Sequence, residues 1–66
     1  MKIICSAIVG DPKKAEDLCQ SAEKLGAEAE LRSGTVYAEF NGKKKAVFKL
    51  MELFRQYPYH GYTILG

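Results

Sequence analysis

Residues 3–12 read IICSAIVGDP and decide the fold, because a strand ends and a helix begins within them. Ile3–Val9 is an apolar run rich in β-branched residues, and Gly10 bounds it, which favours a buried central strand. Asp11 is a favourable N-cap, and Pro12 suits the first helical position, where its missing N–H costs nothing. The stretch therefore predicts a central strand that leads directly into a helix.

The helix that begins at Pro12 is predicted to end at Gly26, a residue type that commonly ends helices. Its apolar residues recur at three- and four-residue steps, so they form one stripe along the helix. They are Ala15, Leu18, Cys19, Ala22 and Leu25.

Two stretches with period-two alternation follow, residues 27–32 and 35–40, joined by Ser33-Gly34. In each, apolar side chains point one way and polar or aromatic ones the other. The first group is Ala27, Ala29, Leu31, Val36, Ala38 and Phe40, and the second is Glu28, Glu30, Arg32, Tyr37 and Glu39. This pattern predicts a β-hairpin with a short glycine-containing turn.

Asn41-Gly42 breaks the strand, and a second helix is predicted from about Lys43 to Tyr57, closed by Pro58. A last strand is predicted at residues 62–65. The order β-α-β-β-α-β predicts one compact α+β domain over residues 1–66, an open-faced sandwich that is ferredoxin-like or HPr-like. Its four-stranded antiparallel sheet would carry two helices on one face.

Composition bounds the classes of protein to which the chain can belong. Its 66 residues are 47% hydrophobic and 27% charged, a composition typical of a globular protein. The net charge of +2 is too small to indicate nucleic-acid binding by itself. No stretch approaches the ~20 apolar residues that a membrane span needs. Cys5 and Cys19 lie in apolar stretches, so we expect buried free thiols in a reducing compartment and a cytoplasmic protein.

Five lysines open the two predicted helices: Lys13 and Lys14 in the first, and Lys43, Lys44 and Lys45 in the second. We expect the first and third strands to pair as parallel neighbours, so that both helices begin at one edge of the sheet. Each cation at a helix N-terminus opposes the macrodipole at a cost of up to ~1 kcal/mol. Five of them suggest an anion-binding edge for phosphate, nucleic acid or an acidic protein, the alternative being a cluster kept for solubility.

Phe48 falls outside the apolar arc of the second helix, between Arg55 and Glu52 and one turn from Lys44. An exposed phenylalanine among basic side chains has the form of an anchor for a protein partner. A covering loop, or a helix rotated from this prediction, would bury it instead. The arc itself contains Ala46, Val47, Leu50, Met51, Leu53, Phe54 and Tyr57.

The outer face of the predicted sheet carries Glu28, Glu30 and Glu39 with Arg32 and Tyr37. Carboxylates repel a phosphate backbone, so RNA binding on this face is not expected. Ile4 and Ile8 are predicted to point away from the helices, where a second copy of the chain could cover them. Both a monomer and a homodimer therefore stay open.

The segment from Phe54 to Tyr62 is rich in aromatic residues that could stack on bases or pack at an interface. In so small a domain these rings more simply cover the edge of the core. His60 is the only histidine, and neither cysteine stands at metal-ligand spacing from it, so neither a metal nor a cofactor is expected.

Ser21-Ala22-Glu23-Lys24-Leu25 and Val47-Phe48-Lys49-Leu50 look like segments of an HPr phosphocarrier. That family carries its phosphate on a histidine in a Gly-x-His-x-Arg-Pro segment that opens the first helix. The corresponding stretch here, Gly10-Asp11-Pro12-Lys13-Lys14, has neither the histidine nor the arginine, so the resemblance does not imply phosphocarrier activity.

With no nucleophile–base pair and no glycine-rich phosphate loop in sight, we do not expect an enzyme. We expect a small binding or regulatory module that engages a protein or protein–nucleic acid partner through the lysine edge and the second helix, with Lys44, Phe48 and Arg55. An inhibitor encoded by a phage or mobile element would suit this size. The alternative is direct binding of nucleic acid or phosphate by the five lysines, and a phosphocarrier-like transfer protein is less expected.

Overall fold

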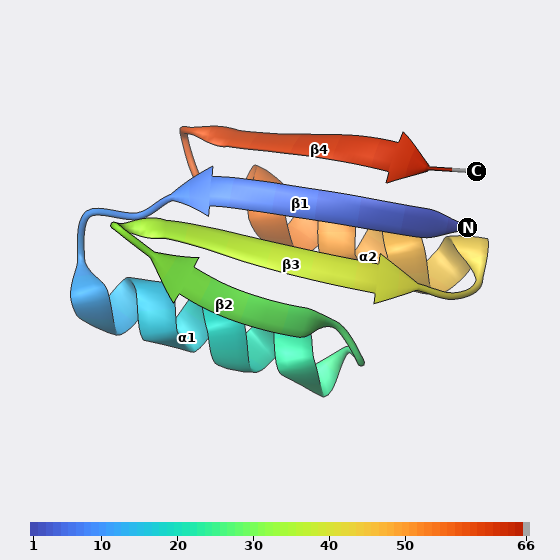
Figure 1. Ribbon diagram of the computed structural model, residues 1–66, viewed down its shortest axis with the longest axis horizontal. Coiled ribbons are helices and arrows are strands. Elements are labelled where there is room, and N and C mark those ends of the chain that lie inside the picture. Colours follow the sequence, from blue (N-terminus) through green and yellow to red (C-terminus); the bar gives the residue numbers. More distant parts are fainter. Residues whose placement is uncertain (66) are drawn as a thin grey trace.

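The computed structural model describes residues 1–65 of the chain, and six elements follow one another along it. They are strand β1 (Lys2–Ile8), helix α1 (Pro12–Lys24), strands β2 (Glu28–Arg32) and β3 (Thr35–Asn41), helix α2 (Lys44–Arg55) and strand β4 (His60–Leu65). The predicted order β-α-β-β-α-β is confirmed (Figure 1). The last strand begins at His60 rather than at Tyr62, which makes it longer than the sequence indicated.

The strand order in the sheet is β2-β3-β1-β4, and every neighbouring pair is antiparallel. The expectation that the first and third strands run parallel is therefore wrong. Ser33 and Gly34, with φ of 48° and 80°, form a tight turn that makes β3 antiparallel to β2. The connection through α1 makes β2 parallel to β1, so β3, which lies between them, is antiparallel to both. This is the ferredoxin-like arrangement of the open sandwich.

Both helices cover one face of the sheet and leave the other face open (Figure 1). α1 packs against β2 and β3, and α2 packs against β1 and β4. The core between the layers is apolar, and no polar or charged residue among residues 1–65 is buried. The fully buried residues of largest volume are Phe54, Ile3, Leu18, Leu50, Val36, Val47 and Cys5.

The two helices begin differently. At α1, the Asp11 carboxylate accepts a hydrogen bond of 2.9 Å from the backbone N–H of Lys13, as the predicted N-cap requires. At α2, Lys43 occupies the N-cap position and its side chain makes no capping hydrogen bond. The start of α2 is therefore stabilised less by its own residues than the start of α1. No helix of residues 1–65 has the length and apolar character needed to cross a membrane.

Gly26 ends α1 with a φ of +96°, and a Cβ built there would lie 3.3 Å from Cε1 of Phe40. We expect Gly26→Ala to lower the free energy of unfolding by about 1–2 kcal/mol, because this left-handed conformation strains alanine. Gly10→Ala is the control, since nothing lies within 4 Å of a Cβ at that position. Urea unfolding followed by circular dichroism compares the two variants, and equal losses would contradict this account.

Candidate functional site

The five lysines at the helix starts are divided between the two ends of the molecule. α1 begins after the end of β1, and α2 begins after the end of β3. Because β1 and β3 are antiparallel, the two helices begin at opposite ends of the long axis, along which the molecule extends 31 Å (Figure 1). Lys13 and Lys14 therefore share no edge with Lys43, Lys44 and Lys45, and the single lysine-rich edge inferred from the sequence does not form.

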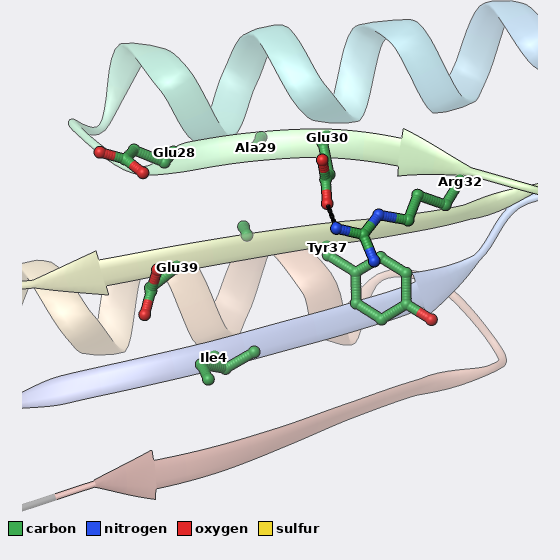
Figure 2. Close-up of a pocket in the computed structure, with 8 residues that line it drawn as sticks. Ile4, Glu28, Ala29, Glu30, Arg32, Tyr37 and Glu39 are labelled. Carbon is green, nitrogen blue, oxygen red and sulfur yellow. Dashed lines mark ion pairs between the residues drawn. The ribbon is translucent and has the colours of Figure 1, made fainter.

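The open face of the sheet carries charged side chains over β2 and β3 (Figure 2). Glu28 lies opposite Glu39 in the register of these strands, and Glu30 lies opposite Tyr37, so all four point to this face. Arg32 forms an ion pair with Glu30, and its Cζ lies 6.0 Å from the centre of the Tyr37 ring. The outward placement predicted for these residues is confirmed. They line a shallow depression of about 400 Å³ together with Ile4, Ala29 and Ala38.

Carboxylates outnumber cations around this depression. Lys2 Nζ lies 2.8 Å from Glu39 Oε1, and the hydrogen bond to this carboxylate raises the pKa of Lys2. Glu28 lies directly across from Glu39, and like charges in that position repel one another. A phosphate backbone would bring further negative charge to this face, which the carboxylates of Glu28 and Glu39 repel.

On the β1 side, the open face becomes apolar. Ile4 and Ile8 are exposed there, as the sequence predicted, while Ile3 and Cys5 point into the core. The two isoleucines stand on either side of Ser6, so a polar side chain interrupts the apolar surface. A second copy of the chain could cover this strip, in which Ile4 lines the depression described above and Ile8 does not.

One flank of α2 presents a mixed basic and apolar surface, which we call the α2 flank: Lys44, Phe48, Met51 and Arg55. These residues recur at steps of four, three and four, so they lie in one row along the helix. Phe48 is 44% exposed, and Lys44 Nζ lies 5.5 Å from the centre of its ring. The sequence prediction that Phe48 lies outside the buried arc is therefore confirmed.

The α2 flank lies on the side of α2 that faces β4. The opposite side of the helix lines a groove with α1, formed by Ser21, Lys24, Leu25, Lys49, Glu52, Leu53 and Gln56. Because α2 packs on β1 and β4, its side remote from α1 is the one nearest the outer strand. The cation–aromatic pair of Lys44 and Phe48 therefore stands beside the β4 edge of the sheet.

Strand β4 adds two more exposed apolar side chains to this region. Tyr62 and Ile64 lie opposite the buried residues Cys5 and Ile3, so they point to the helix-covered face. They are nevertheless 53% and 42% exposed, because β4 extends beyond the cover that α2 provides. Together with the α2 flank they form what we call the β4-edge surface.

The sequence did not reveal Tyr62 and Ile64 as surface residues. Their alternation with Gly61 and Thr63 predicts a strand, but alternation does not say whether a strand is central or at an edge. The missing information was the strand order. The one available signal was that residues 60–65 contain no Asp, Glu, Lys or Arg.

The other aromatic residues near the end of α2 divide between core and surface. Phe54 is buried, Tyr57 is half-buried against the core, and Tyr59 is exposed, so only part of this segment covers the core edge. His60 Nδ1 lies 2.6 Å from the backbone oxygen of Tyr57. Among residues 1–65, no group of three or more His, Cys, Asp or Glu side chains is placed to hold a metal ion.

The two cysteines are free thiols, and only Cys5 is fully buried, whereas Cys19 is half-buried. Burial raises the pKa of Cys5 to about 11 from its ordinary value of 9.0. Burial also raises the pKa of Cys19, and the carboxylates of Glu23 and Glu16 raise it further. Both thiols are therefore poor nucleophiles at neutral pH.

The stability of the fold should depend on pH through Cys5. The folded-state pKa lies above the unfolded value, so the stabilisation is complete below pH 9 and is lost as the pH rises to about 11. We expect the free energy of unfolding to fall over this range by on the order of 2 kcal/mol. In Cys5→Ala that loss should be absent, while the titration of other groups continues. Urea unfolding across this range measures both proteins, and identical pH profiles would refute the assignment.

Fold and site together define a small ferredoxin-like α+β domain whose exposed apolar side chains gather on one flank of a helix and along an edge strand. In comparisons with known proteins, no family model matches the chain, and no curated protein or solved structure matches it significantly.

Proposed function

We propose that this chain is a non-enzymatic protein-binding module that engages its partner through the α2 flank, with Phe48 as the anchor and Lys44 and Arg55 as flanking cations. A regulatory or inhibitory role belongs to the same proposal, because so small a domain acts by occupying a partner's surface. The free thiols of Cys5 and Cys19 favour a reducing, cytoplasmic environment for it.

The main observation that supports the proposal is the exposure of the Phe48 ring. The other apolar residues of α2 are buried or half-buried, whereas this ring is 44% exposed with a cation above it. A few residues contribute most of the binding energy in protein interfaces, with Trp, Tyr and Arg enriched among them, and they do so where the partner desolvates them. The half-exposed Tyr62 and Ile64 nearby would enlarge the contact.

A pair of matched substitutions tests the role of Lys44. Lys44→Glu places an anion in the first turn of α2, which contributes about 0.3–1 kcal/mol and offsets the lost contact with Phe48, so the free energy of unfolding should stay within about 1 kcal/mol of the wild-type value. The same change should weaken partner binding by at least about tenfold, because it removes a flanking cation. Lys13→Glu makes the equivalent change in the first turn of α1, at the other end of the molecule, and should leave binding intact.

The experiment is affinity capture from the native host with the wild-type chain, identification of the partner by mass spectrometry, and binding measurements with both variants. Thermal unfolding of each variant shows that any loss of binding is not a loss of fold. A partner that binds Lys44→Glu as well as wild type would contradict the proposal.

Direct nucleic-acid binding is the second candidate function, and one observation still favours it. Lys43, Lys44 and Lys45 stand together at the start of α2, where no side chain caps the helix. Because Lys13 and Lys14 lie at the other end of the molecule, the five lysines do not form the larger positive surface that the sequence predicted. Nuclease treatment during capture separates the two functions, since material lost on treatment indicates nucleic acid and a retained protein indicates the interface proposed above.

A further inference from the structure

β4 is the outermost strand on its side of the sheet, and its backbone has unpaired groups on the free edge. Ile8 N–H donates a hydrogen bond of 2.9 Å to the Tyr59 carbonyl, and this bond fixes which residues of strands β1 and β4 bond to each other. Because bonding direction alternates along an antiparallel strand, Gly61, Thr63 and Leu65 bond toward β1. The N–H and C=O groups of His60, Tyr62 and Ile64 consequently point outward.

The two edges of the sheet differ in protection. β2, at the other edge, carries three charged side chains in five residues: Glu28, Glu30 and Arg32. β4 has no Asp, Glu, Lys or Arg along its six residues. Charged side chains on an edge strand discourage pairing with another chain, so β2 is protected and β4 is open to an added strand.

Side chains of an added strand would meet the β4-edge surface. On the helix-covered face they would pack against Tyr62, Ile64 and Phe48, all of which are exposed. α2 runs antiparallel to β4, so Lys44 stands toward the end of β4 and Arg55 toward its beginning (Figure 1). The site is apolar at its centre and basic at both ends.

The positive charges of Lys44 and Arg55 disfavour a second copy of this chain as the occupant. A two-fold symmetric pairing of β4 with itself is antiparallel, so the beginning of one β4 lies beside the end of the other. That pairing brings Arg55 of one copy toward Lys44 of the next, two cations with no carboxylate of the β4-edge surface between them. An occupant with carboxylates at its ends meets the same charges favourably.

We propose that an extended acidic segment of a partner protein adds to β4 as a fifth strand, with apolar side chains on Phe48, Tyr62 and Ile64 and carboxylates near Lys44 and Arg55. Main-chain hydrogen bonds to Tyr62 and Ile64 hold the segment, and the apolar contacts select its sequence. This inference rests on the proposed protein-binding function and specifies the mode of binding.

The test uses the full chain and a phage-displayed library of random linear peptides as the probe. Selected peptides should carry Asp or Glu at their ends and alternating apolar residues between them. On binding, the amide hydrogens of Tyr62 and Ile64 should exchange at least about tenfold more slowly, because each outward N–H gains an acceptor. Heteronuclear NMR on the wild-type chain measures this exchange.

Two edge substitutions complete the design. Ile64→Pro removes an outward N–H without removing a bond to β1, so the fold should persist while peptide affinity falls by about tenfold or more. Leu31→Glu alters an equally exposed apolar residue on the opposite edge strand and should leave the affinity unchanged. Exchange of the core amides verifies that both variants are folded.

Strand addition would be overturned by enrichment of basic peptides, by failure of the library to yield any binder, or by bound peptides that leave the Tyr62 and Ile64 amides unprotected. Sedimentation that shows a dimer disrupted by Ile64→Pro would also overturn it, because the occupant would then be a second copy. If capture of the native partner depends on Phe48 while these amides stay unprotected, only strand addition fails. If the amides are protected and Phe48→Ala has no effect, the proposed function fails instead.

Discussion

Phe54→Ala is expected to leave the protein largely unfolded or barely stable at 25 °C. Phe54 is the largest fully buried side chain, with 1% of its surface exposed, and it packs from α2 into the core. Phenylalanine-to-alanine changes at such positions cost about 3–5 kcal/mol, because the lost contacts leave a cavity. At roughly 0.05–0.15 kcal/mol per residue, a domain of this size has little more stability than that.

Phe48→Ala is the matched control, since it makes the same chemical change on the same helix at an exposed position. It should cost less than about 1 kcal/mol, mainly through the contact with Lys44. Urea unfolding followed by far-ultraviolet circular dichroism measures both variants. Similar losses in the two would mean that the placement of these rings, inside and outside the core, is wrong.

Phe48→Ala should have its large effect on binding instead. Removing the anchor of the α2 flank is expected to weaken the complex with the captured partner by about 2 kcal/mol or more, which is at least about 30-fold in Kd. The effect should appear mostly in a faster dissociation rate, because the ring acts within the formed contact. Surface plasmon resonance with immobilised partner measures both rates.

Tyr59→Ala tests whether any exposed ring would give this result. Tyr59 is 69% exposed, and it stands beside Ile8 at the open face of the sheet, away from the α2 flank. Its replacement should leave Kd within about twofold of the wild-type value, as surface substitutions outside an interface do. A larger loss for Tyr59→Ala than for Phe48→Ala would locate the partner on the wrong face for this account.

The elements and the core could be predicted from local pattern because each has a strong local cause. The Asp11-Pro12 start, the Gly26 end and the Ser33-Gly34 turn each depend on the conformational preferences of those residues. The residues of the α1 stripe and the α2 arc are all buried or half-buried, and Phe48 was correctly placed outside them.

The prediction of a single lysine-rich edge was wrong, although the hairpin in the sequence already determines the direction of β3. A two-residue turn makes β3 antiparallel to β2, and a helical crossover makes β2 parallel to β1, so β1 and β3 had to be antiparallel. Parallel central strands would put Lys13 beside Lys43, whereas the antiparallel pairing of β1 and β3 puts the starts of α1 and α2 at opposite ends (Figure 1). Which charged residues of a sequence lie together on one surface can be predicted only when the directions of the strands are known.

The β4-edge surface depends on the same non-local information. Tyr62 and Ile64 alternate as residues of a half-buried strand, and only the order β2-β3-β1-β4 places them at an edge. Phe48 and Lys44 could be found from the helical period, because their contact lies within one turn. The part of the candidate site on α2 could therefore be predicted from the sequence, whereas the part on β4 could be found only from the strand order.

Site-specific photo-crosslinking tests most directly where the partner binds. A photoreactive phenylalanine analogue is placed at position 48 in one protein and at position 37, on the open face, in another, and each is irradiated in the presence of the native partner. We predict that the partner is crosslinked from position 48 and not from position 37. Crosslinking from position 37 alone would contradict the central claim that the α2 flank is the interface.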